Sequence, residues 1–145
     1  MTTKELVKKW KGNKRYTLKF IEMMPEEHFD FKPVDGMKTF QSQISHITSW
    51  LRTHSRFVTG IEFPKVRTSS KEMVFDALEN FFNTFIASLE TLTTEQLTEV
   101  VDVWYGKTTR YQIANVMDNH LSHHRGQMVV YLRLAGHKPP SYIGW

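Results

Sequence analysis

HLSHHRGQMVVYLRLAG, residues 120–136, is the stretch that decides the fold of this 145-residue chain. Its apolar residues recur at helical spacing, in a pattern that starts near residues 108–109 and continues to about Ala135. A glycine and two prolines then end the predicted helix. His120 and His124 are four residues apart, so both imidazoles lie on one face of this helix. The same face carries side chains expected in or near the core: Ile113, Met117, Gln127 and Tyr131.

Three further segments repeat apolar residues at helical spacing. The first covers residues 3–24 and stops at a proline, and the second starts near Thr39 and ends before Gly60. The third begins after a pair of possible serine caps at residues 69–70. The sequence therefore predicts an all-α fold, a four-helix bundle with at least one long connection, formed by residues 1–145 as a single domain.

The link before the last helix has a mixed pattern. Residues 98–105 alternate loosely and are rich in Val, Trp and Tyr, which favours an extended segment. Gly106 and Lys107 are then expected to form a turn.

The composition excludes several classes of protein. Hydrophobic residues make up 40% of the chain and charged residues 23%, as in folded globular proteins. The absence of cysteine excludes disulfides, thiolate zinc sites and a cysteine nucleophile. No apolar run is long enough to span a bilayer, and the N-terminus lacks an apolar signal core, so we expect a cytoplasmic protein without a membrane partner.

The chain is basic, with a net charge of +4. Six Lys and Arg residues fall between residues 8 and 19, but on a helix they point in several directions, which favours a solvated surface. A nucleic-acid-binding helical protein remains an alternative. It predicts salt-sensitive binding through Lys8, Lys9, Lys11 and Lys14.

The histidine spacing indicates a possible metal site. Two neutral imidazoles one helical turn apart can bind one divalent cation, and a third ligand must then come from another helix. His46, beside the apolar seam of the second predicted helix, is the best candidate, and His54 competes with it. The alternative is that His120 and His124 are hydrogen-bonded core residues. The ligand chemistry does not distinguish zinc, nickel or iron.

Several motifs resemble those of the DinB-like (YfiT-type) metal-binding proteins. They are HLSHHRGQ followed by YLRLAGHKPP in the last helix, and FKP, GMKTF and SHI between residues 31 and 47. The resemblance covers nearly the whole chain. It implies a four-helix bundle with a long crossover, frequent homodimers, and a divalent metal, zinc or nickel, held by His46, His120 and His124.

The resemblance also suggests an activity. Known branches of this family transfer low-molecular-weight thiols such as bacillithiol, mycothiol or glutathione, or isomerise maleylpyruvate with one. The chain is therefore expected to transfer a thiol cosubstrate to a small electrophilic molecule, and its lack of cysteine requires the sulfur to come from that cosubstrate. A metal-dependent hydrolase is one alternative. A non-catalytic metal-stabilised module is another, with His54 or His123 as a fourth ligand.

Several further residues are expected to support the three histidines. Gln127, Tyr131 and Trp50 are expected beside the three histidines. Arg125 is expected to anchor a helix end or the C-terminal tail, and Gly126 to permit close helix packing. No acidic residue is placed to hold the second ring nitrogen of a ligand, so carbonyls or water are expected there. Trp145 and the aromatic third helix are possible parts of a dimer interface.

Overall fold

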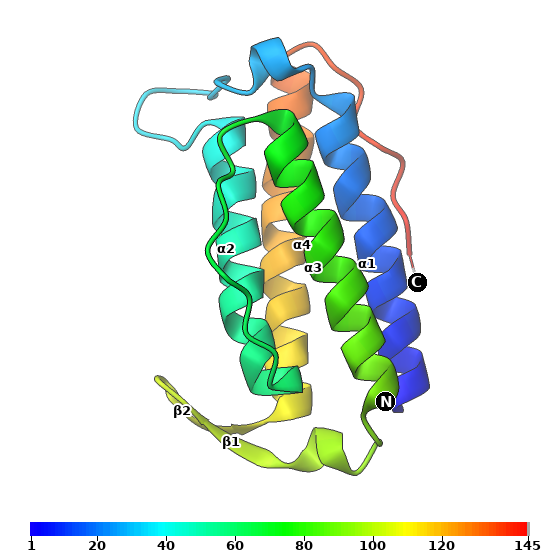
Figure 1. Ribbon diagram of the computed structural model, residues 1–145. Coiled ribbons are helices and arrows are strands. Elements are labelled where there is room, and N and C mark those ends of the chain that lie inside the picture. Colours follow the sequence, from blue (N-terminus) through cyan, green and yellow to red (C-terminus); the bar gives the residue numbers. More distant parts are fainter. Residues whose placement is uncertain (145) are drawn as a thin grey trace.

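The computed structural model describes residues 1–144, so the expectation about Trp145 lies outside the described residues. Four long helices dominate the structure (Figure 1): α1 (Thr3–Met23), α2 (Phe40–Thr59), α3 (Lys71–Thr91) and α4 (Arg110–Leu134). Shorter elements connect them: the 3₁₀ helices η1 (Glu26–His28) and η2 (Gln96–Thr98), and the strands β1 (Val100–Val103) and β2 (Gly106–Thr109). The predicted four-helix bundle is confirmed.

Hydroxyl side chains fix where the helices begin. Each long helix starts after a Thr or Ser whose side chain accepts a hydrogen bond from a backbone N–H of the first turn. Thr109 forms a reciprocal capping box with Gln112 at the start of α4, and this sets the register of the helix that carries two of the histidines. At the other end of α2, Gly60 adopts a positive φ of 78° and closes the helix, as expected.

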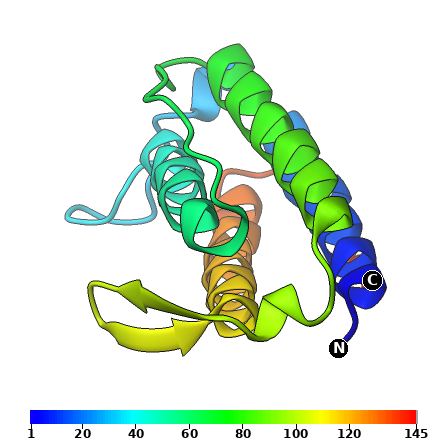
Figure 2. The same cartoon turned by 60° about the horizontal axis from the view of Figure 1, so that its bottom comes forward.

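The bundle contains the predicted long crossover. Helices α1 and α4 run in one direction, and α2 and α3 run in the other (Figure 1). Two consecutive parallel helices cannot be joined by a short turn, so residues 60–70 run back along the length of α2. Viewed from below, α2 lies beside both α3 and α4, and α1 contacts the same two helices (Figure 2). Helices α2 and α4 are thus antiparallel neighbours.

The link before α4 folds into an antiparallel hairpin. The extended segment predicted over residues 98–105 is present as the shorter strand β1, but the turn lies at Trp104 and Tyr105, two residues earlier than predicted. Gly106 is already paired with Val103 across the ladder, with a positive φ of 131°. The position that requires glycine is therefore the first residue of β2 and not the turn itself.

Large rings fill the core between α1 and α3. Trp10 is completely buried, and its ring centroid lies 4.8 Å from that of Phe85 in an edge-on contact. Phe81 and Phe82 pack on the same indole. Among residues 1–144, no helix has the length and apolarity that a membrane crossing requires.

Candidate metal site

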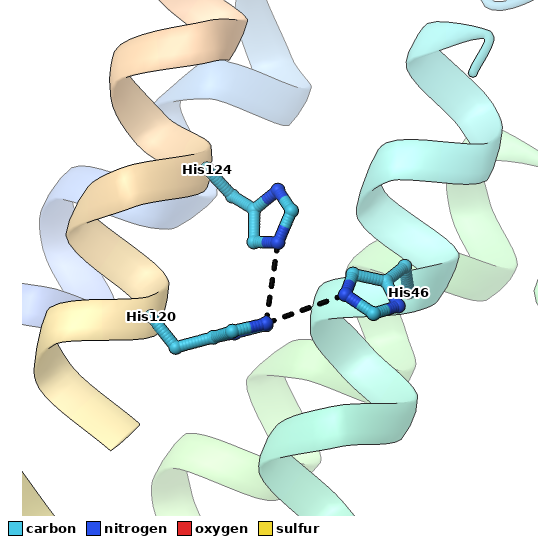
Figure 3. Close-up of side chains that lie close together, drawn as sticks. All are labelled: His46, His120 and His124. Atoms are coloured by element: carbon cyan, nitrogen blue, oxygen red, sulfur yellow. Dashed lines mark hydrogen bonds between the residues drawn. The ribbon is translucent and has the colours of Figure 1, made fainter. Parts of the chain in front are cut away.

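Three histidines from α2 and α4 point toward one another (Figure 3). The Nε2 atom of His120 lies 3.3 Å from Nε2 of His46 and 3.2 Å from Nε2 of His124. One ring nitrogen from each of the three histidines lies within 4.8 Å of those of the other two. The structure thus brings together the three residues that the spacing and the resemblance selected, across the antiparallel α2–α4 pair.

The spacing of these nitrogens matches a shared metal ion. Imidazole nitrogens bind zinc at about 2.0–2.1 Å, and tetrahedral geometry then places two ligand nitrogens about 3.3 Å apart. The two distances centred on His120 agree with this value. Neutral imidazole is a ligand for zinc, nickel, copper and iron alike, so the donor set fits a divalent transition metal.

Glutamine side chains set the tautomer of His124. Its Nδ1 atom lies 2.9 Å from Oε1 of Gln43 and 2.8 Å from Oε1 of Gln127. Amide oxygens only accept hydrogen bonds, so Nδ1 carries the proton. In the neutral ring, Nε2 is then left with its lone pair facing the other two histidines, as a metal ligand requires.

A hydrogen-bonded relay fixes the orientation of Gln43. The hydroxyl of Tyr131 donates to the carbonyl oxygen of Lys38 at 2.6 Å, and its oxygen accepts from Nε2 of Gln43 at 3.4 Å. With its amino group held there, Gln43 presents its oxygen to His124. The relay runs from the loop before α2, through Tyr131 of α4, back to Gln43 of α2 and on to His124. It therefore couples the tautomer of His124 to the packing of the two helices.

His120 is partly buried against an aromatic ring. Its ring stacks on Trp50 with centroids 3.9 Å apart and an interplanar angle of 10°. Its Nδ1 atom is buried without a hydrogen-bond partner among the described residues. Burial, and then the neighbouring imidazoles His124 and His46, lower the pKa of His120 from 6.5 to about 4. The ring is therefore neutral at physiological pH, the state in which it can bind a cation.

The other two candidate histidines stay outside the group. His54 is 2% exposed, stacks on Trp50 at 3.5 Å, and its Nδ1 donates to the Trp50 carbonyl at 2.8 Å. His123 is exposed on the outer side of α4. Among residues 1–144, no fourth His, Asp or Glu joins the three nitrogens.

The residues expected beside the three histidines lie there, and the structure adds one that the sequence analysis does not name. Gln127 contacts His124, Trp50 stacks on His120, and Tyr131 acts through Gln43. This residue is Gln43. The sequence predicts carbonyls or water at the outer ring nitrogen of a ligand, whereas side-chain amide oxygens lie at Nδ1 of His124 in the structure. The sequence signal for Gln43 is its position three residues before His46, which places the two side chains next to each other on one helix face.

Arg125 matches its predicted role only in part, and Gly126 differs from its predicted role. Arg125 is 8% exposed and donates to Oδ1 of Asn13 at 2.8 Å, so it joins α4 to the middle of α1 and not to a helix end. Of the C-terminal tail, Tyr142 interacts electrostatically with the guanidinium. Its guanidinium also lies 5.0 Å from the ring centre of Tyr16. Gly126 is exposed, and a Cβ atom there meets nothing within 4 Å, so close packing does not explain this glycine.

The metal-free protein is expected to lose stability as the pH falls from about 6.5 to about 4. The pKa of His120 is lowered to about 4, and burial also lowers the pKa of His46 and of His124, whereas unfolded imidazoles titrate near 6.5. Between these values the unfolded chain binds more protons, so the free energy of unfolding decreases as the pH drops. Urea unfolding at several pH values measures the free energy of unfolding of the wild type and of His120→Gln. An identical pH dependence in both proteins would contradict the contribution of His120.

The two glutamines are expected to substitute for each other. Either Gln43→Leu or Gln127→Leu leaves one acceptor for the His124 Nδ1 proton, so each change alone should weaken metal binding only slightly. The double variant removes both acceptors and should weaken binding about 10–100-fold, as for other outer partners of metal-bound histidines. Calorimetric titration with zinc measures this, and additive effects of the two single changes would argue against a shared proton.

Comparisons with known proteins agree with this architecture. Residues 1–144 match the model of the DinB family. The uncharacterized protein YjoA of Bacillus subtilis is 22% identical over 139 residues, covering 92% of this chain and 90% of YjoA. A DinB-like protein from Bacillus cereus has the same fold, with a TM-score of 0.86, 22% identity and 97% of each chain covered.

A more distant structure shares the bundle. YfiT from Bacillus subtilis, described as a probable metal-dependent hydrolase with an unusual four-helix bundle topology, matches with a TM-score of 0.66 and 14% identity. The match covers 92% of this chain and 86% of YfiT. With the family match extending over every described residue, and with the crossover bundle and its three facing histidines in place, the chain belongs to the DinB family.

Proposed function

We propose that this protein is a divalent-metal-dependent enzyme that transfers a low-molecular-weight thiol to an electrophilic small molecule. The observation that carries the proposal is the convergence of three imidazole nitrogens with no fourth protein ligand among residues 1–144. Three protein ligands and an open position are typical of catalytic metal sites, whereas structural sites are closed by four. This feature favours an enzyme over a non-catalytic metal-stabilised module.

The chain's own residues hold the site in a receptive state. Gln43 and Gln127 keep His124 in the tautomer that presents Nε2, and burial keeps His120 neutral. A divalent cation bound there acts as a Lewis acid that lowers the pKa of a coordinated thiol or water. In the transfer, the thiol loses its proton to solvent, its sulfur forms a bond to the electrophilic carbon, and the leaving group departs with its electron pair. With no cysteine in the chain, the sulfur belongs to the cosubstrate.

Aromatic rings beside the site support an electrophile with an apolar part. Rings in contact lead from His120 through Trp50 and His54 to Trp104 in the hairpin. Trp104 is 63% exposed, so this row ends at the protein surface. Exposed apolar surface of this kind, close to a polar centre, is typical of ligand-binding regions.

The test compares sulfur and water as nucleophiles. The zinc- or nickel-loaded protein is incubated with an aryl halide and with bacillithiol, mycothiol or glutathione, and mass spectrometry follows the thioether product. We expect product formation that requires both metal and thiol and is lost in His120→Ala. A metal-loaded protein that forms no thioether with any of these thiols would contradict thiol transfer.

Hydrolysis is the second candidate, favoured by the fold shared with YfiT, which is described as a probable metal-dependent hydrolase. A divalent cation held by His46, His120 and His124 would supply the Lewis acidity that activates water toward an ester or amide. Aryl esters and anilides incubated without thiol distinguish the two functions. Metal-dependent release of the acid without thiol would establish the hydrolase, and its absence together with thioether formation would establish the transferase.

A further inference from the structure

A separate pocket lies between α2 and the crossover segment of residues 60–70. It has a volume of about 230 Å³, below the range of about 300–1,000 Å³ that is usual for drug-sized ligands. Its lining combines two cationic residues, Arg52 and Lys65, with several hydroxyl groups. None of the lining residues is acidic, and none of the three metal-site histidines takes part.

Arg52 is a buried cation without a counter-ion. Its side chain belongs to a residue that is only 7% exposed, and none of the ion pairs within residues 1–144 includes it. Burial lowers its pKa, with no carboxylate acting in the opposite direction. Buried charges in proteins are normally paired, because an unpaired ion is costly to remove from water. An arginine in this state therefore suggests a partner that is not part of the chain.

The guanidinium is held in place with donors to spare. Its Nη2 atom donates to the carbonyl oxygen of Pro64 at 2.8 Å, and its Nη1 donates more weakly to that of Ala77 at 3.4 Å. The same group lies 4.7 Å from the ring centre of Phe63. These contacts use two of the five N–H donors, so a rigid and partly unused fork faces a small cavity. Such a fork matches the paired oxygens of carboxylate and phosphate.

We propose that this crossover pocket binds a small oxyanion, the phosphate or carboxylate group of a small molecule, with Arg52 as its counter-ion. Lys65, exposed on the crossover segment, adds a second positive charge. The hydroxyl of Ser49, which lines the pocket one turn before Arg52, is a further donor. A bound anion would tie the crossover segment to α2. The proposal does not depend on the activity of the metal site.

Nuclear magnetic resonance tests the proposal on the full chain. Inorganic phosphate and acetate are titrated separately into ¹⁵N-labelled protein, with chloride keeping the ionic strength constant. We expect saturable shifts of the Arg52 Nε–H signal and of the backbone amides of Lys65 and Val66 with at least one of the two anions, and the more tightly bound anion identifies the ligand group. The absence of saturable shifts with both anions, or shifts confined to the lysines of α1, would overturn the proposal.

Three variants separate this site from other causes. Ser49→Asp places a carboxylate three residues before Arg52, where it can pair with the guanidinium, and should weaken anion binding at least about tenfold. Ser141→Asp makes the same change of charge at an exposed position in the C-terminal segment and should leave binding unchanged. His120→Ala should also leave it unchanged, and loss of binding in this variant would assign the anion to the metal site and refute the crossover pocket.

Discussion

Replacing His120 with alanine is expected to lower the affinity for zinc or nickel by more than about 100-fold. Loss of an outer hydrogen-bond partner already costs about 10–100-fold, and removal of a ligand should cost more. His120 has the central position, because its Nε2 lies within 3.3 Å of both other Nε2 atoms. His46→Ala and His124→Ala should also lose tight binding, although each leaves one of these two close pairs. Calorimetric titration of purified, untagged protein measures the three affinities.

His123→Ala is the matched control for this experiment. His123 is adjacent to His124 in the sequence but is exposed, outside the group of three nitrogens. The control protein should bind one ion per chain with the affinity of the wild type. Equal losses in His123→Ala and His124→Ala would show that binding depends on the histidine cluster as a whole and not on the three facing nitrogens.

Replacing Arg125 with alanine is expected to destabilise the protein by about 3 kcal/mol, because breaking a buried charged network costs about 3–5 kcal/mol. The guanidinium donates to Asn13 at 2.8 Å and to the hydroxyl of Ser122 at 3.0 Å. Asn13 in turn donates to Asp118 at 2.8 Å, so the change leaves Asn13 without its charged partner between α1 and α4. The melting temperature of a domain of this size should fall by roughly 10 °C. Calorimetry or circular dichroism measures both quantities.

Arg133→Ala is the comparison on the same helix. Arg133 is exposed in the last turn of α4, so its loss should change stability by at most about 0.5 kcal/mol. Arg125→Ala should still bind metal once folded, because the guanidinium contacts none of the three ligands through a hydrogen bond. A variant of normal stability that has lost the metal would reverse this assignment and give Arg125 a role in the site.

Local patterns in the sequence were sufficient to predict the helices. Hydroxyl caps, a C-terminal glycine and apolar residues at helical spacing are local features, and α2 begins after Thr39 and ends before Gly60 as these features indicate. The hairpin turn was misplaced because glycine was read as a turn residue. In the structure its positive φ belongs to the first residue of β2, and Trp104 and Tyr105 form the turn.

The candidate site was predictable only where the signal was periodic. His120 and His124 share a helix face by their spacing alone, and His46 followed from its place beside an apolar seam. The partners of His124 depend on how α2 packs on α4, because Gln43 is 81 residues from His124 in the sequence. Arg125 is likewise explained by α1, 112 residues away from it at Asn13. No local pattern contains such contacts.

The most direct test of the central claim is a crystal structure of the zinc-loaded protein with anomalous data collected at the metal edge. The geometry predicts one anomalous peak per chain, about 2.0–2.1 Å from the Nε2 atoms of His46, His120 and His124. The Nδ1 atom of His124 should keep its contacts with Gln43 and Gln127. A peak bound by other residues, or no peak in protein crystallised with zinc, would contradict a metal site at these three histidines.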